Sequence, residues 1–130
     1  MIVVDSSVWI SHFADMLHPE VKQLRAIYEV ETILVGDLIL LEVLRGAQSD
    51  QKAARIAERL SFFDTAIMID RAIATQAATN YRRLRSLGIT IRNSIDLIIG
   101  TYCIEHGHRL LHRDRDFRHM RQLGLQIYAS

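Results

Sequence analysis

Short apolar runs alternate along this chain with longer amphipathic segments, and this alternation constrains the fold more than any other feature. The runs predict five strands, at residues 2–4, 32–35, 66–69, 109–112 and 125–128. The segments between them have the apolar spacing of helices. We expect helices at residues 8–10 after a cap at Ser6 or Ser7, and at 18–29, 36–46, 51–63, 71–87, 93–106 and 117–123. Strands separated by helices indicate an α/β fold with a mostly parallel sheet of about five strands, covered on both faces.

The length and composition favour a single domain over residues 1–130. Hydrophobic residues make up 49% of the 130 residues, which suffices for a core without disulfides or a structural metal. Cys103 is the single cysteine and lies in an apolar run, so we expect a packed thiol and a reducing compartment. The start of the chain lacks the features of a signal peptide, and no apolar run approaches the roughly 18 residues of a membrane span. We therefore expect a cytoplasmic protein without a membrane partner.

The net charge of +1 conceals an asymmetry between the two halves. Residues 1–70 contain six Lys and Arg against eleven Asp and Glu, a balance of −5, whereas residues 71–130 contain ten against four, a balance of +6. All ten cations of the second half are arginines, which bind phosphate in a bidentate manner and stack on bases. One arginine alone indicates only a solvated helix face, but the cluster indicates an anionic partner, either nucleic acid or an acidic protein.

Three carboxylates interrupt apolar runs. Asp5 follows the first predicted strand directly, and Glu42 and Asp96 lie within apolar helical segments. Burying an ionised carboxylate is costly unless a partner compensates its charge. In an open parallel sheet, the carboxyl ends of the strands and the starts of the following helices meet at the edge where ligands bind. Asp114 and Asp116 follow the fourth predicted strand, and we therefore expect all five acids to surround one pocket.

A hard divalent cation would stabilise such a cluster. Close carboxylates repel one another and raise one another's pKa unless a cation neutralises them. Oxygen ligands suit Mg²⁺, which bridges to phosphate, and such ions activate water for phosphoryl displacement. Together with the arginines, the acids therefore suggest hydrolysis of phosphodiester bonds. Local explanations exist for single acids: Asp5 and Asp96 could cap their helices. Glu42 could pair with Arg45, and the two later acids could be solvated turn residues.

Four segments resemble, in order, the motifs of the PIN-domain ribonucleases, and specifically of the VapC-type toxins of bacterial toxin–antitoxin pairs. They are residues 2–10 around Asp5, residues 41–46 around Glu42, residues 91–100 around Asp96, and residues 110–117 around Asp114 and Asp116. Any one of these motifs is weak by itself. Four of them in order, spanning residues 2–117, are fairly specific.

The resemblance implies a three-layer α/β/α PIN domain that is the toxic endoribonuclease of a type II toxin–antitoxin pair. Its catalytic acids would be Asp5, Glu42, Asp96, Asp114 and, as a fifth member, Asp116. The first four would bind Mg²⁺ or Mn²⁺, and a metal-activated water would attack an RNA phosphodiester. Ser6 and Ser7 would orient a ligand or the phosphate, and Arg92, Arg113 and Arg115 would contact the substrate. A cognate antitoxin protein would occupy the groove of the active site and block it. The chain would form homodimers.

One position departs from the family pattern. His112 stands where the family often has Thr or Ser. A neutral imidazole could hydrogen-bond within the site or point away from it, and histidine is a better ligand for Mn²⁺ or Zn²⁺ than for Mg²⁺. We expect His112 to support the site rather than to bind the metal.

Other α/β functions fit the chain less well. A phosphoryl-accepting receiver domain needs adjacent acids after the first strand and a late lysine, whereas serines follow Asp5 and the only lysines are Lys22 and Lys52. A haloacid-type phosphatase needs a second Asp at position 7, where this chain has Ser7. A P-loop or dinucleotide fold needs a glycine-rich turn after the first strand, and this chain has none there. Two alternatives stay open: a non-catalytic PIN-like module that binds RNA or protein, and a PIN nuclease of RNA processing without an antitoxin.

Overall fold

Five parallel strands form the centre of the fold. The computed structural model describes residues 1–128, and its sheet has the strand order β3-β2-β1-β4-β5. The strands are β1 (Ile2–Val4), β2 (Ile33–Gly36), β3 (Asp64–Ala66), β4 (Arg109–Leu111) and β5 (Gln126–Ile127). Every strand pair in this part of the chain is parallel, so the expected parallel sheet of about five strands is confirmed.

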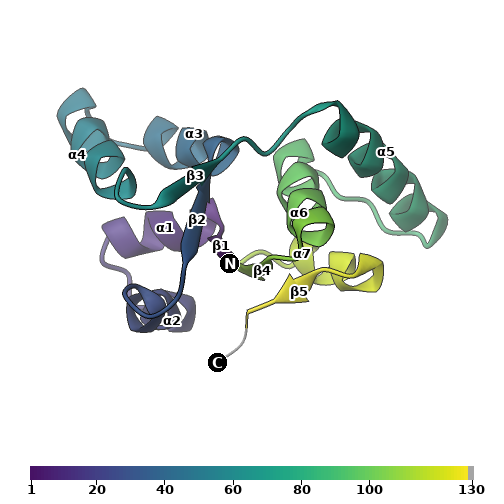
Figure 1. Ribbon diagram of the computed structural model, residues 1–130, viewed down its shortest axis with the longest axis horizontal. Coiled ribbons are helices and arrows are strands. Elements are labelled where there is room, and N and C mark those ends of the chain that lie inside the picture. The colour runs from purple at the N-terminus through teal and green to yellow at the C-terminus, as the bar shows by residue number, and fades with distance from the viewer. Residues whose placement is uncertain (129–130) are drawn as a thin grey trace.

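Helices cover both faces of the sheet, as the alternating pattern predicts. They are α1 (Ser6–Phe13), α2 (Pro19–Ile27), α3 (Asp37–Arg45), α4 (Asp50–Leu60), α5 (Arg71–Ser86), α6 (Ser94–His106) and α7 (Asp116–His119), followed by the 3₁₀ turn η1 (Met120–Leu123). Figure 1 shows α1 to α4 on one side of the sheet and α5, α6 and α7 on the other. The three-layer α/β/α architecture is therefore confirmed.

The chain changes direction across the sheet between β1 and β4. From β1 it proceeds through β2 to β3 along one face, then returns and continues through β4 to β5 along the other face (Figure 1). At such a switch point, the segments that follow two neighbouring strands leave in opposite directions and open a crevice at the carboxyl ends of the strands. Asp5 follows β1 and Asp114 follows β4, so the topology brings the first and fourth motifs together.

Asp5, rather than Ser6 or Ser7, is the N-cap of α1. Its Oδ2 accepts a hydrogen bond from Ser7 N at 3.1 Å, which satisfies one of the free amides of the first helical turn. The prediction of a serine cap was wrong. Aspartate and serine are about equally preferred at the N-cap position, so the sequence alone does not decide which of these adjacent residues is the cap. Asp70 and Asn93 cap α5 and α6, and both helices begin within one residue of their predicted starts.

The third strand lies earlier than predicted. It ends at Ala66 instead of running over residues 66–69. Met68 N donates to the side chain of Asp37 at 3.1 Å, so the backbone here leaves the sheet. The Met68 side chain covers Gly36, where even a Cβ would overlap its sulfur. Most of the apolar run at residues 66–69 therefore crosses over the end of β2 and does not extend the strand.

The core lies between the sheet and the two helix layers. It contains fully buried side chains such as Trp9, Leu110 and Phe117. Cys103 is completely buried, and burial raises the pKa of its thiol above the usual range, so the predicted packed thiol is confirmed. No helix within residues 1–128 is both long and apolar enough to cross a bilayer.

Candidate active site

Three of the predicted acids meet at the carboxyl edge of the sheet. Asp5 follows β1, Glu42 lies in α3, and Asp96 lies in the first turn of α6. One carboxylate oxygen of each lies within 4.8 Å of the other two, which is close enough to share a cation. The three residues are 2%, 7% and 6% exposed, so little water screens the repulsion between them.

Asp114 and Asp116 form a second acidic group with Asp96. Oxygens of these three carboxylates also lie within 4.8 Å of one another. Asp96 belongs to both groups, so it links the acids of β1 and α3 to the acids that follow β4. Asp114 and Asp116 are only half-buried, which leaves this side of the cluster open to solvent. The fold thus gathers all five predicted acids around Asp96.

Asp5 has one satisfied carboxylate oxygen and one unsatisfied oxygen. Its Oδ2 accepts hydrogen bonds from Ser7 N at 3.1 Å and from Ser7 Oγ at 2.6 Å. Its Oδ1 is buried and has no hydrogen-bond partner within the described residues. Leaving a buried acceptor unpaired costs about 1–3 kcal/mol, so a ligand that binds this oxygen would recover free energy.

Glu42 is held by two side chains. Ser6 Oγ donates to Glu42 Oε1 at 2.9 Å, and Arg45 Nη2 lies 3.6 Å from Glu42 Oε2. The local pairing with Arg45 therefore exists, but it is weak because the arginine side chain is largely exposed. The hydroxyl groups of Ser6 and Ser7, for which the resemblance implies contact with a ligand or the phosphate, each donate to an acid in this structure.

Side-chain acceptors hold the loop after β4. Arg113 N donates to Ser7 Oγ at 3.3 Å. Asp114 N donates to His112 Nδ1 at 3.1 Å, and Asp116 N donates to Asp114 Oδ1 at 2.9 Å. Ser7 therefore connects the start of α1 to the loop that carries the second acidic group.

The two central acids bind protons well above the usual pH range of aspartate. Burial raises the pKa of Asp5 from 3.8 to about 6, although hydrogen bonds from Ser7 oppose the rise. Burial raises the pKa of Asp96 from 3.8 to about 8, and the neighbouring Asp5 and Asp114 add to this rise. Without a cation, the cluster therefore holds a proton near neutral pH, which is typical of acids arranged for metal binding or proton transfer.

The donor set suits a hard divalent cation. Within the described residues, both groups offer carboxylate oxygens and contain neither a thiolate nor an imidazole. Oxygen ligands of this kind suit Mg²⁺ and Mn²⁺. A cation would also pair with the free Oδ1 of Asp5 and would relieve the repulsion that raises the pKa of Asp96. The arrangement can therefore hold a divalent metal ion.

The arginines near the acids differ in how free they are. Arg113 Nε lies 3.7 Å from Glu20 Oε1, and Arg113 Nη1 donates to Ser11 Oγ at 3.4 Å. The sequence does not reveal the roles of Glu20 and Ser11, because no local pattern connects α1 or α2 to position 113. Arg92 and Arg115 are exposed, and no side chain of residues 1–128 pairs with either of them. These two arginines are therefore available to a phosphate.

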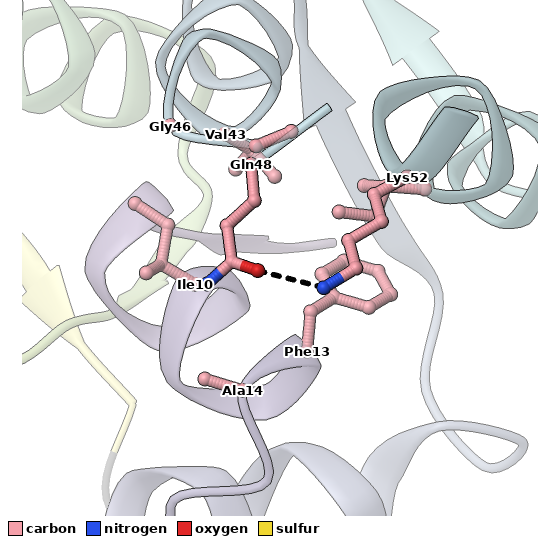
Figure 2. A pocket seen from close by; sticks show the side chains of 9 residues that line it. Ile10, Phe13, Ala14, Val43, Gly46, Gln48 and Lys52 are labelled. Carbon is pink, nitrogen blue, oxygen red and sulfur yellow. Dashed lines mark hydrogen bonds between the residues drawn. The ribbon is translucent and has the colours of Figure 1, made fainter. Parts of the chain in front are cut away.

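A groove separate from the acids lies between α1, α3 and α4. It encloses about 230 Å³ and is lined by Ile10, Phe13, Ala14, Val43, Gly46, Ala47, Gln48, Lys52 and Ile56. Figure 2 shows Ile10, Phe13 and Ala14 of α1 on one wall, with Gln48 pointing across it to Lys52. A neighbouring cavity extends along α4 past Arg55 and Arg59, so the groove has an apolar floor and a cationic rim. We call this feature the α1–α4 groove.

Comparison with known proteins gives the family. The family model of the PIN domain matches residues 2–123. The chain belongs to the PIN-domain family. The VapC ribonuclease Mb1587 of Mycobacterium bovis and the ribonuclease VapC11 of Mycobacterium tuberculosis are each 35% identical to this PIN domain over 121 residues. The alignment covers 90% of this chain and 89% of each relative.

Solved structures have the same PIN fold. VapBC2 from Rickettsia felis, bound to a DNA fragment from its promoter, aligns with a TM-score of 0.79 and 16% identity over 98% of both chains. VapC20 of Mycobacterium tuberculosis, a toxin that cleaves the sarcin–ricin loop, aligns with a TM-score of 0.70 and 17% identity over 91% of this chain and 93% of that one. At this level of identity, the structures support the fold alone.

Proposed function

We propose that this chain is the toxin of a type II toxin–antitoxin pair and that it hydrolyses RNA phosphodiester bonds with a divalent metal ion. Relatives that are 35% identical over 90% of the chain are named VapC ribonucleases, which supports the activity. The observation that carries the proposal is the buried acid cluster around Asp96, with a free oxygen on Asp5. A module that only binds RNA or protein gains nothing from burying carboxylates that repel one another.

Four acids would hold the ion: Asp5, Glu42, Asp96 and Asp114. Asp116 would complete the set on the side that is open to solvent. We propose Mg²⁺ as the ion, with Mn²⁺ as a substitute. When bound, it would polarise the phosphate and lower the pKa of a water for attack on phosphorus.

The serines and arginines would have different roles from one another. Ser6 and Ser7 would position the carboxylates of Glu42 and Asp5, because their hydroxyl groups already donate to them. Arg92 and Arg115 would contact substrate phosphates, because both are exposed and unpaired among the described residues. Arg113 contributes less to this contact, since Glu20 already neutralises part of its charge.

The α1–α4 groove would receive a segment of the cognate antitoxin. Its apolar floor fits one face of an amphipathic helix, and its rim of Lys52, Arg55 and Arg59 fits acidic side chains on that helix.

We also propose a cytoplasmic homodimer, for which the exposed side chains of Leu41 and Ile67 offer apolar surface.

Growth arrest and RNA cleavage test the proposed activity directly. Wild-type chain, Asp96→Asn and Asp64→Asn would be induced in separate bacterial cultures, and total RNA would be sequenced for new 5′ ends. Asp64 lies exposed in β3, away from the acid cluster, and serves as the matched control. We expect wild type and Asp64→Asn to arrest growth and to produce discrete new ends. We expect Asp96→Asn to cleave at least about 100-fold more slowly, because metal-assisted charge stabilisation contributes several kcal/mol.

Other outcomes of this experiment point to other functions. Full cleavage by Asp96→Asn would exclude the metal mechanism. A folded wild-type chain that neither arrests growth nor cuts RNA would favour the non-catalytic binding module. Cleavage of one RNA at one site without growth arrest would favour a nuclease of RNA processing.

A further inference from the structure

His112 lies directly after β4, beside the acids but outside both acidic groups. Its ring is half-buried and contacts the ring of Phe117, with centroids 5.1 Å apart. Phe117 is completely buried, so it gives the imidazole a fixed apolar support. The other feature of the ring is its hydrogen bond, in which Nδ1 accepts from Asp114 N at 3.1 Å.

This bond fixes the state of the ring. A ring nitrogen that accepts an N–H bond carries no proton, so the proton of the neutral imidazole is on Nε2. The lone pair of Nδ1 is also occupied and is not directed at a cation. His112 is therefore not a metal ligand through Nδ1, and its contact is with the backbone of an acid.

The same bond has the connectivity of a side-chain turn. A side-chain acceptor at one position accepts the amide N–H two residues later, as Asn, Asp, Ser and Thr do in Asx and ST turns. Asp114 repeats this connectivity, because its Oδ1 accepts from Asp116 N at 2.9 Å. Two successive turns thus determine where the carboxylates of Asp114 and Asp116 lie relative to Asp96.

We propose that His112 is a positioning residue whose Nδ1 holds the backbone of Asp114 and thereby sets the second acidic group for a divalent cation. The ring replaces the oxygen of a side-chain turn, and Phe117 orients it. The part of this proposal that concerns the cation rests on the proposed function, whereas the hydrogen bond from Asp114 N to His112 Nδ1 does not depend on it. Groups that orient metal ligands in this way typically change metal affinity by 10–100-fold when removed.

Metal binding measures this role separately from cleavage. Mn²⁺ affinity would be measured by calorimetry on the purified full chain for wild type, His112→Asn and His112→Phe. Asn keeps an acceptor for Asp114 N without the ring, and Phe keeps the ring contact without an acceptor. His119→Phe is the control, because His119 lies exposed in α7. We expect His112→Phe to weaken Mn²⁺ binding at least about tenfold, with His112→Asn and His119→Phe close to wild type.

A measurement on the wild type keeps the proposal testable if His112→Phe does not fold. Nitrogen NMR of the imidazole should show the proton on Nε2 and a coupling from Nδ1 to the amide of Asp114. A proton on Nδ1 would overturn the proposal, as would wild-type Mn²⁺ affinity in folded His112→Phe. Equal losses in His112→Asn and His112→Phe would also overturn it, because the ring and not the acceptor would then matter. If the expected Mn²⁺ series appears but wild type cuts no RNA, the proposed function fails while the role of His112 stands.

Discussion

At the scale of single residues, Asp96 connects function to stability. In the metal-free protein, the native state keeps a proton on Asp96 up to about pH 8, whereas the unfolded chain releases it near 3.8. The native state therefore binds more protons over this range, so the free energy of unfolding falls as the pH rises from about 4 to about 8. We expect Asp96→Asn, which cannot ionise, to be close to wild type in stability at pH 4 and increasingly more stable than wild type as the pH rises to 8. Urea unfolding with a chelator at both pH values measures this, and a variant less stable than wild type at pH 8 would contradict it.

The five acids could be found from the sequence, but their supporting contacts could not. A charge inside an apolar run is an anomaly that sequence alone displays, which is why Glu42 and Asp96 were identified. The bond from Arg113 N to Ser7 Oγ joins residues 106 positions apart, and no local pattern encodes it. The support that Ser7 gives to Asp5 through its hydroxyl is therefore visible only in the tertiary structure.

At the scale of elements, a buried polar contact fixes α5 against α6, the helix that carries Asp96. Asn80 Nδ2 donates to Thr101 Oγ1 at 3.1 Å, and both residues are buried. We expect Asn80→Ala to lower the free energy of unfolding by about 1–3 kcal/mol, because it leaves the Thr101 hydroxyl unpaired and opens a cavity. Thr101→Val should also destabilise, yet the double variant Asn80→Ala with Thr101→Val should cost less than the two single changes together. Strictly additive costs in denaturant unfolding would show that the two side chains do not depend on each other.

Element boundaries followed from the sequence where they depend on local contacts. The start of α5 is fixed by Asp70, whose Oδ1 accepts from Ile73 N only three positions later. The position of β3 depends instead on its register with β2, where Leu34 pairs with Asp64, and the sequence around β3 contains no sign of that pairing. The start of α5 was therefore predicted correctly, because its cap is a local contact. The position of β3 was predicted wrongly, because it depends on pairing with a distant segment.

At the scale of the whole molecule, a cation would link β1, α3, α6 and the loop after β4. Because the acids come together only in the native state, an ion that binds them there should stabilise the entire fold. At 100 times its dissociation constant, Mg²⁺ or Mn²⁺ should raise the free energy of unfolding by about 2.7 kcal/mol. At one fixed metal concentration, the gain should be smaller at pH 5 than at pH 8, since protons on Asp5 and Asp96 compete with the ion and raise its dissociation constant. Thermal unfolding with and without metal measures this, and Asp96→Asn should show little of the gain.

The α1–α4 groove and the acid cluster occupy different places, so inhibition and catalysis should be separable. Ile10 is 45% exposed on the wall of the groove, whose lining includes none of the five acids, so Ile10→Arg should leave the fold and RNA cleavage intact. The same change removes apolar surface from the groove and adds a charge there. Because full burial of such a side chain contributes about 1.5–3 kcal/mol, the antitoxin should bind about 10–100-fold more weakly.

Co-expressed antitoxin should then restore growth to cells that contain wild type but not to cells that contain Ile10→Arg. Phe62→Arg is the control, because Phe62 is 83% exposed outside the groove. Escape by Phe62→Arg with full neutralisation of Ile10→Arg would instead place the antitoxin at the turn between α4 and β3.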